Sequence, residues 1–349
     1  MAGPAPAVGA PRRADAAGWE ERVRAAVRTL DGPDVVVAVS RDGERFVHSG
    51  GHGPARHADR ERLRYEIGSA SKTYTVLLMA ALAHAGRVGA HDPVVAHLPP
   101  SRPDPHRDAI TLTHLATHTS GLPRLPHDAE FLRRAVPAWR TNPYAEYDTG
   151  HLLDAFARAR VRHRPGSRWW YSNFGVSLLG QALARTTATS YADLLTDHVL
   201  GPLGLGNTGL HPGTPGRDAV GHRRDGTTPV PPLVMRGFAP AGAVRATPHD
   251  LLTFLEAHLA PERTPLTAAL REVTRPVLRR GLRPRQTHTL TWFRDGDVFY
   301  HPGATSGHEA FLGFDRATRT AVAVLAARSW SRRSSLGLTG YALLTEAGA

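Results

Sequence analysis

The chain has 349 residues, of which 41% are hydrophobic and 21% are charged, so it can bury a sizeable core. The formal net charge is +12, but the arginines stand singly or in pairs, which is typical of a solvated basic surface. We therefore expect neither a nucleic acid nor a membrane as a partner, and the absence of cysteine excludes disulfides, thiolate metal sites and a cysteine nucleophile.

The first residues, 1–17, are rich in alanine, proline and glycine and have no apolar region of the kind found in signal peptides. We expect a disordered leader here. No stretch approaches about 18 continuous apolar residues, so we expect no membrane span and a cytoplasmic location. The composition leaves the oligomeric state open.

The start of the chain alternates between helical and extended patterns. Apolar residues at helical spacing predict a helix over 19–30. A β-branched run over 34–40, a turn at Arg41-Asp42-Gly43 and a second run over 45–48 are typical of a β-hairpin. A further helix is predicted over 73–86, directly after a serine-containing segment.

The middle of the chain, about 86–245, is expected to consist of helices and loops. Helical patterns cover 148–159, 176–187 and 191–200. Thr247 then has the features of an N-cap, because a proline and an acidic residue follow it in the first turn.

Extended patterns return near the C-terminus. Runs over 287–293 and 298–300 flank an Asp-Gly turn, a second pair covers 310–314 and 320–326, and a closing helix covers 336–346. Strands at both ends of the chain predict an α+β fold, with an antiparallel sheet flanked by the terminal helices and a large helical domain. We assign residues 18–85 and 246–349 to the sheet domain and residues 86–245 to the helical domain.

One basic residue, Lys72, is a candidate for a catalytic role. Lys72 is the one lysine of the chain, against 42 arginines, and it follows Ser69 by three residues. Arginine keeps its proton in proteins, whereas a buried lysine can lose it and act as a base. Residues three apart share a helix face, so Ser69 and Lys72 can hydrogen-bond, whereas Ser71 would point away. This pair is a candidate nucleophile and base.

Two further segments contain polar residues that could belong to the same catalytic site. Tyr171-Ser172-Asn173 lies between aromatic residues and a predicted helix, and His301-Pro302-Gly303 follows a predicted strand. Taken alone, Tyr171 also fits an interface tyrosine, and His301 fits a residue that caps a strand.

Together with Glu66-Ile67-Gly68-Ser69-Ala70-Ser71-Lys72-Thr73, these segments resemble the class C β-lactamase and penicillin-binding-protein family of active-site serine enzymes. Segments 115–123 and 201–205 support the resemblance, which extends over about 32–344. The resemblance implies that Ser69 forms an acyl-enzyme and that Lys72 assists its deprotonation. It also implies that Tyr171 carries the proton to the leaving group and later activates the incoming nucleophile.

The same resemblance implies the groups that bind the substrate. Asn173 would orient Lys72 and the acyl side of the substrate. The backbone N–H groups of Ser69 and Ala304 would form the oxyanion hole, with Gly303 beside them. We call His301-Pro302-Gly303 the third motif. No cofactor is implied.

His301 departs from the family pattern, because lysine is usual at this position of β-lactamases, while histidine is common in related esterases and aminopeptidases. A neutral imidazole provides less charge for a carboxylate. We therefore expect a small-molecule ester or amide as substrate, in an esterase, an amidase or an acyltransferase. A transacylase that passes the acyl group to an amine in secondary metabolism is the alternative, and a true β-lactamase or D,D-peptidase is less favoured.

Three alternatives to a serine acyl-transfer enzyme are a protein with a metal site, an α/β-hydrolase and a binding protein. His114 and His118 have the i, i+4 spacing of metal ligands, but no third ligand of suitable type follows, so we expect no metal. The chain lacks the Gly-x-Ser-x-Gly elbow of α/β-hydrolases. Trp292 and Phe293 are expected in the core or in a pocket wall. A binding protein that uses the fold without turnover is a further alternative.

Overall fold

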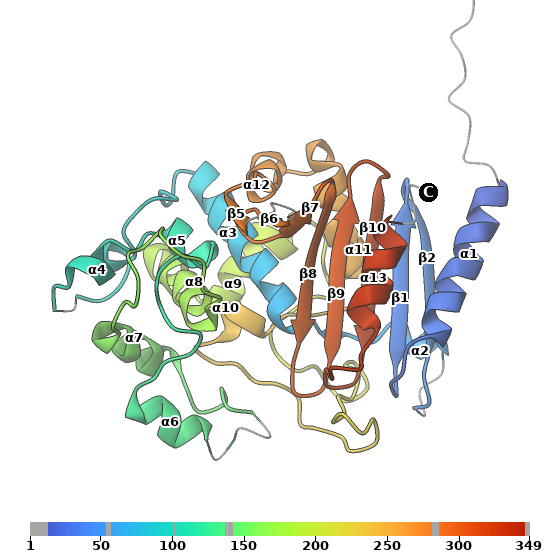
Figure 1. The fold of residues 1–349 in the computed structure, drawn as a ribbon, viewed down its shortest axis with the longest axis horizontal. Helices are drawn as coiled ribbons and strands as arrows, with labels where there is room; N and C mark the ends of the chain where they lie inside the picture. The colour runs from blue at the N-terminus through green and yellow to red at the C-terminus, as the bar shows by residue number, and fades with distance from the viewer. Residues whose placement is uncertain are drawn as a thin grey trace, which may run out of the picture.

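The computed structural model describes residues 13–53, 57–100, 102–136, 138, 142–280 and 286–345. In this part of the chain, an antiparallel sheet has the strand order β2-β1-β10-β9-β8-β7-β6-β5 (Figure 1). Its strands are β1 (Val35–Arg41), β2 (Glu44–Gly50), β5 (Leu278–Arg280), β6 (Gln286–His288), β7 (Phe293–Asp295), β8 (Val298–Ala304), β9 (Glu309–Asp315) and β10 (Thr320–Ala326). A separate pair is formed by β3 (Tyr65–Glu66) and β4 (Arg245–Ala246).

Helices surround this sheet, and the region between β3 and β4 consists of helices and loops (Figure 1). They are α1 (Arg13–Arg28), α2 (His57–Arg60), α3 (Ser71–His84), α4 (Pro105–Asp108), α5 (Leu112–Ala116), α6 (Ala129–Ala135), α7 (Thr149–Arg158), α8 (Asn173–Thr187), α9 (Tyr191–Leu195), α10 (Ala239–Gly242), α11 (Pro248–Leu259), α12 (Thr267–Val273) and α13 (Leu336–Thr345). Shorter helical turns are η1 (Gly68–Ala70), η2 (Val94–Ala96), η3 (Thr196–Leu200) and η4 (Pro261–Arg263).

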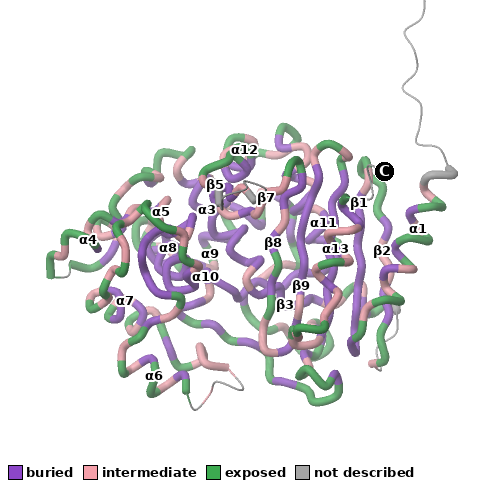
Figure 2. Tube along the Cα trace, viewed as in Figure 1, coloured by how far each residue is buried: buried purple, intermediate pink, exposed green. Residues whose placement is uncertain are grey.

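Strand β1 shows how the sheet is covered on both faces. Successive side chains of a strand point to opposite faces. Val35, Val37 and Val39 belong to a core shared with the terminal helices α1 and α13. Val36 and Ala38 belong to the larger core on the other face, where α11 packs against β1. The predicted α+β fold, with terminal helices against an antiparallel sheet, is confirmed, and Figure 2 shows the buried strands between these layers.

The predicted helical character of the middle region is also confirmed. Helix α8 is buried from its first residue to Ala184, and α3 packs against α8, α10 and α12. The division of the chain into a sheet domain and a helical domain stays a prediction.

The predicted leader was too long. Helix α1 begins at Arg13, so residues 13–17 are helical rather than disordered, and 1–12 lie outside the described residues. The reason is packing, because Ala16 contacts the core cluster that α1 shares with the sheet.

The strand predicted over 287–293 was wrong. Strand β6 ends at His288, and β7 begins at Phe293. Between them, the Thr289 Oγ1 accepts a hydrogen bond from the Trp292 N–H at 2.9 Å, and the Thr289 N–H donates to the Trp292 carbonyl. This local turn divides the segment 287–293, in which threonine alternates with larger residues, into two strands. Trp292 lies in the core, as expected.

Smaller differences affect two other elements. The helix predicted over 191–200 divides into α9 and the π-helical turn η3. Strand β8 extends beyond the predicted 298–300 as far as Ala304, and therefore includes the third motif. The predicted N-cap is present, because the Thr247 side chain accepts a hydrogen bond from the Asp250 N–H.

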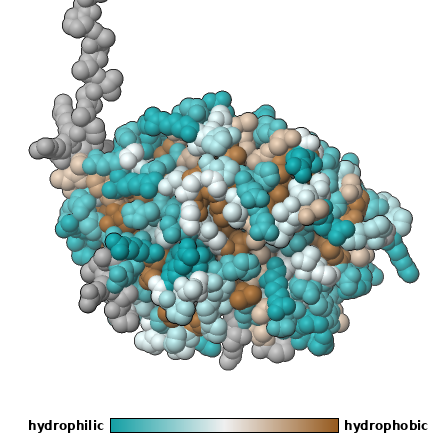
Figure 3. All heavy atoms as spheres, turned by 180° about the vertical axis from the view of Figure 1, so that it is seen from behind, coloured by the Kyte–Doolittle hydropathy of each residue, from teal (hydrophilic) through white to brown (hydrophobic). Residues whose placement is uncertain are grey.

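The surface mixes polar and apolar residues. Seen from behind, the apolar residues lie in small separate groups among hydrophilic ones (Figure 3). Among the described residues, no helix combines the length and the apolar character that crossing a bilayer requires.

Candidate active site

Two glycines allow the turn η1, which carries Ser69, to lie against the end of β8. Gly68 has a φ of +50°, and a Cβ on it would lie 2.5 Å from the Ala304 carbonyl oxygen. A Cβ on Gly303 would lie 1.9 Å from the Ile67 carbonyl oxygen. Neither contact is sterically possible, so glycine at both positions sets the close approach of the two segments. Ser69 is thereby held beside the end of the strand.

Three predicted side chains meet at the Ser69 hydroxyl. The Tyr171 hydroxyl donates a hydrogen bond to Ser69 Oγ at 2.7 Å, and Lys72 Nζ lies 3.2 Å from the same oxygen. Lys72 Nζ also donates to the Ala241 carbonyl oxygen in α10 at 2.7 Å. Ser69 itself is partly exposed, so a substrate can reach its hydroxyl.

Burial favours the uncharged forms of both partners of Ser69. Lys72 is 1% exposed. Burial lowers the pKa of its amine well below the ordinary value of 10.5, and the charge of Arg124 lowers this pKa further. Burial also raises the pKa of the Tyr171 hydroxyl to about 12. The site therefore favours a neutral amine, which can accept a proton, beside a neutral phenol, which can donate one.

The segment that carries Tyr171 is anchored by its neighbour Ser172. The Ser172 hydroxyl donates to the Pro123 carbonyl at 2.6 Å and accepts from the Gly175 N–H, which caps α8. The Ser172 N–H donates to Nδ1 of His118 at 3.2 Å, and the His118 ring lies 4.5 Å from the Tyr171 ring. These contacts fix the position of the tyrosine.

The histidine pair considered as metal ligands has other partners. His118 supports the Tyr171 segment, and burial lowers the pKa of its ring well below the ordinary value. Nδ1 of His114 accepts a hydrogen bond from the Thr111 N–H at the start of α5. No cluster of three or more potential metal ligands occurs among the residues that the structure describes.

Asn173 lies at the start of α8, with its backbone N–H bonded to the Arg124 carbonyl. Burial raises the pKa of the Tyr144 hydroxyl, and the Asn173 side chain acts against this shift. The Oδ1 atom of Asn173 is buried with no hydrogen-bond partner among the described residues. The hydrogen bonds of Lys72 go to Ser69 and to the Ala241 carbonyl, so the expected contact from Asn173 to Lys72 is not present in this structure. Its role toward the acyl side of a substrate stays a prediction.

The register of β8 determines where the Ala304 N–H points. Ala304 is opposite Glu309, and the next pair is joined by a hydrogen bond from the Thr305 N–H to the His308 carbonyl. Because hydrogen-bonded and non-hydrogen-bonded pairs alternate in an antiparallel ladder, the Ala304 N–H points away from β9. The Ser69 N–H lies in the first turn of a helical segment, where N–H groups lack intrahelical acceptors. Both donors are suited to the predicted oxyanion hole.

His301 lies on β8 and is buried. Its Nδ1 lies 2.7 Å from the Pro302 carbonyl oxygen, which can accept only from a protonated nitrogen. Burial lowers the pKa of His301 to about 3. The third motif therefore carries a neutral ring near neutral pH.

A cavity of about 240 Å³ opens at Ser69. Of the predicted site residues, Ser69, Asn173 and Ala304 line it. The rest of the wall is formed by Gly68, Pro143, Tyr144, Leu233, Met235, Ala241, Gly242, Thr305 and Ser306.

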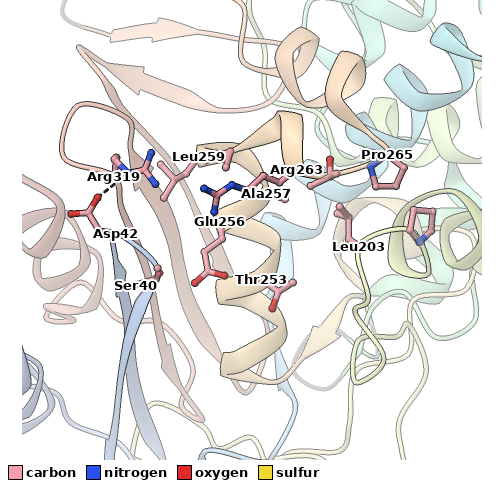
Figure 4. Close-up of a pocket in the computed structure, with 14 residues that line it drawn as sticks. Ser40, Asp42, Leu203, Thr253, Glu256, Ala257, Leu259, Arg263, Pro265 and Arg319 are labelled. Carbon is pink, nitrogen blue, oxygen red and sulfur yellow. Dashed lines mark hydrogen bonds and ion pairs between the residues drawn. The ribbon is translucent and has the colours of Figure 1, made fainter. Parts of the chain in front are cut away.

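A second cavity, of about 350 Å³, lies between α11 and the β1–β2 turn (Figure 4). Asp42 and Arg319 form an ion pair there at 2.8 Å. None of the predicted site residues lines this second cavity, so the chemistry belongs to the first.

A buried charge network that the sequence did not reveal lies behind Ser69. Glu66 accepts hydrogen bonds from Arg245 and from the Leu233 N–H, each at 2.8 Å, and His308 Nδ1 lies 3.3 Å from its second oxygen. Burial alone would raise the pKa of Glu66, but His308 and Arg245 lower this pKa to about 2. Because Leu233 lines the cavity, the network joins the segment before Ser69 to the cavity wall.

Three other features of the site also escaped prediction. The Ala241 carbonyl is a backbone acceptor, which leaves no residue-type signal in a sequence. Tyr144 and Arg124 lie in loops without a motif of their own, although Arg124 directly follows the supporting segment 115–123.

An antiparallel sheet with a serine, a lysine and a tyrosine gathered beside its strand β8 defines the class of active-site serine proteins with a β-lactamase-like fold. The family model described as Beta-lactamase matches residues 20–345 of the chain. The chain belongs to the Beta-lactamase family.

Similar proteins have been described in two bacteria. Protein flp of Staphylococcus aureus (strain MW2) is 25% identical over 278 residues, which cover 75% of this chain and 52% of that protein. The D-alanyl-D-alanine-carboxypeptidase/endopeptidase AmpH of Escherichia coli (strain K12) is 29% identical over 198 residues, which cover 56% of this chain and 49% of that protein. The chain thus spans about half the length of these curated relatives.

Solved structures show the same fold. A class C β-lactamase superposes with a TM-score of 0.78 at 19% identity, with 97% of this chain and 98% of that chain covered. The class C β-lactamase from Rhodobacter sphaeroides gives a TM-score of 0.74 at 23% identity, with 97% and 100% covered. At this level of identity, the likeness concerns the fold alone.

Proposed function

We propose that the chain is an acyl-transfer enzyme that takes the acyl group of an ester or amide onto Ser69. The observation that carries this proposal is the meeting of the Lys72 amine and the Tyr171 hydroxyl at Ser69 Oγ, at 3.2 and 2.7 Å. A serine hydroxyl is a weak nucleophile until a neighbouring base accepts its proton, and a buried lysine of lowered pKa is such a base.

Acylation follows from these contacts. The neutral Lys72 amine accepts the Ser69 proton while Oγ attacks the acyl carbon, and the carbonyl oxygen becomes an oxyanion that accepts from the N–H groups of Ser69 and Ala304. Tyr171 gives its phenolic proton to the leaving alcohol or amine, and Lys72 returns a proton to Tyr171. The bond to the leaving group breaks, and the acyl-enzyme, the free leaving group and neutral side chains remain.

The acyl group then passes to a nucleophile. Water makes the chain an esterase or amidase, and this is the function we favour. The incoming water gives a proton to the neutral Lys72 amine, directly or through Tyr171, which passes its own proton on to Lys72, as the water oxygen attacks the acyl carbon. The bond from the acyl carbon to Ser69 Oγ then breaks, and Ser69 Oγ takes that proton back. An amine would enter by the same steps, which makes a biosynthetic transacylase the alternative.

The neutral His301 supports this order of candidates. A β-lactam or a D,D-peptide carries a carboxylate, which a charged third motif binds better than a neutral imidazole does. A β-lactamase or a D,D-peptidase, the activity in the name of the relative AmpH, is therefore the less favoured reading.

Turnover tests the proposal. The purified chain is incubated with p-nitrophenyl esters, p-nitroanilides and a chromogenic cephalosporin, with and without an added amine, and the acid and amide products are separated. We expect ester turnover that Ser69→Ala abolishes, and that Ser306→Ala, which changes another serine of the same cavity, retains. Equal turnover by Ser69→Ala and the unchanged chain would rule out Ser69 as the nucleophile, and cephalosporin turnover above that of the esters would reverse the order of candidates.

A further inference from the structure

An arginine without an acidic partner stands at the catalytic tyrosine. The guanidinium carbon of Arg124 lies 5.4 Å from the centroid of the Tyr171 ring, and Lys72 Nζ lies 5.0 Å from the same centroid. Arg124 is exposed, and no carboxylate among the described residues pairs with it, whereas Arg245 is buried and paired with Glu66. Arg124 does not line the cavity at Ser69, but its positive charge is available to a ligand beside Tyr171.

The position of Arg124 is held by the chain segment that carries the catalytic groups. Its carbonyl oxygen accepts hydrogen bonds from the N–H groups of Asn173 and Phe174, at 3.0 and 3.1 Å. Asn173 and Tyr144 line the cavity at Ser69, and the charge of Arg124 lowers the pKa of the Tyr144 hydroxyl against the effect of burial. The guanidinium thus acts electrostatically on this wall of the cavity.

The third motif lacks a positive charge that could bind an anionic substrate, and Arg124 can supply that charge. Nδ1 of His301 is engaged by the Pro302 carbonyl, and the ring is buried and neutral. A cation that is open to solvent instead lies beside the Tyr171 ring, at Arg124 on the loop between α5 and α6. A guanidinium also offers two parallel N–H donors to a carboxylate, which gives orientation as well as charge.

We propose that Arg124 selects acyl donors that carry a carboxylate on their acyl portion, which it binds beside the wall formed by Tyr144 and Asn173. This inference rests on the proposed acyl transfer and names its substrate class. It also removes the conflict between an acidic substrate and the neutral His301, because Arg124, on the loop between α5 and α6, binds the anion in place of the third motif.

The test compares matched acyl donors. The mono-p-nitrophenyl esters of glutarate, adipate and pimelate are paired with the same esters in which the free carboxylate is a primary amide. For each pair, kcat/KM is measured for the unchanged chain and for Arg124→Gln and Arg124→Lys. The exposed Arg271→Gln, in α12, is the control that removes the same charge elsewhere.

The readout is the ratio of kcat/KM for the anionic ester to that for its amide, because a general effect on Lys72 or Tyr171 cancels in this ratio. We expect a ratio of about ten or more for at least one spacer, from one charged hydrogen-bonded contact. Arg124→Gln should bring the ratio close to one, Arg124→Lys should give an intermediate value, and Arg271→Gln should keep the ratio.

The outcomes separate this inference from the proposed function. If the esters acylate Ser69 but the ratio is near one for every spacer, the substrate class is wrong and acyl transfer stands. If Arg124→Gln slows both members of a pair by the same factor, Arg124 acts only on the catalytic groups, and the inference is also wrong. If no ester of either kind forms an adduct, the proposed function fails, and the inference falls with it.

Discussion

Replacement of Lys72 by arginine separates the roles of charge and proton acceptance. Lys72 Nζ lies 3.2 Å from Ser69 Oγ, and burial shifts its pKa toward the neutral amine. Arginine stays protonated in proteins and cannot take the Ser69 proton. If Lys72 is the base, Lys72→Arg should be as inactive as Lys72→Met, which removes both the charge and the base. If the positive charge is what matters, the arginine variant should be far more active than the methionine variant.

The magnitude follows from the loss of one general base. Such a group typically contributes about 10²–10⁴-fold. At about 1.4 kcal/mol for each factor of ten, this equals about 3–5 kcal/mol of activation free energy. The single-turnover rate of acylation by a p-nitrophenyl ester, followed by p-nitrophenolate release, measures it directly. Circular dichroism and urea unfolding show whether each variant is folded.

The pH dependence supplies a second readout. The neutral amine is the active form, so the acylation rate should rise with pH through the pKa of Lys72, which burial places well below 10.5, and then level off. Tyr171 should add no falling limb at ordinary pH, because burial raises its pKa to about 12. Lys72→Arg should lose the rising limb. The reasoning would be refuted by a folded Lys72→Arg that acylates within a factor of ten of the unchanged chain and keeps the same pH profile.

Further expectations concern the proton donor, the packing of η1 and the buried network. Tyr171→Phe removes the hydroxyl 2.7 Å from Ser69 Oγ and should slow acylation by about 10²–10⁴-fold in single-turnover assays; unaltered kinetics would remove Tyr171 from the mechanism. Gly303→Ala should lower the unfolding free energy by about 2 kcal/mol or more in urea titration, because its Cβ would lie 1.9 Å from a backbone oxygen, whereas Gly337→Ala, with open space around it, should not. Glu66→Gln should cost about 3 kcal/mol at pH 7, since the pKa of Glu66 is lowered from its ordinary 4.5 to about 2 in the folded chain. This contribution is present above pH 4.5 and lost as the pH falls toward 2, so the difference in unfolding free energy between the two chains should shrink over that range, and a pH-independent difference would contradict it.

Local patterns explain what the sequence could predict. The contact between Ser69 and Lys72 follows from a spacing of three residues on a helical segment, which needs no knowledge of the rest of the fold. Tyr171 is 102 residues from Ser69, so its place at the same hydroxyl could be expected only from the resemblance of the three motifs to a family. The closing helix and the hairpin of β1 and β2 follow from periodicity and turn residues.

The missed features depend on contacts that residue types do not encode. The turn at Thr289 arises from a side-chain hydrogen bond within a segment whose alternating pattern is typical of a strand. The carbonyl of Ala241 reaches Lys72 only through the tertiary packing of α10 on α3. Arg124 is one of 42 arginines, and only its place over the Tyr171 ring distinguishes it from the others.

The central claim is that the hydroxyl of Ser69 becomes acylated. Rapid mixing with an activated ester, acid quenching, and mass spectrometry of the intact chain and of its peptides measure this directly. We expect one acyl group per chain, located on the peptide that contains Ser69, absent from Ser69→Ala and present in Ser306→Ala. An adduct on another residue that persists in Ser69→Ala, or no adduct with any activated ester, would contradict the account.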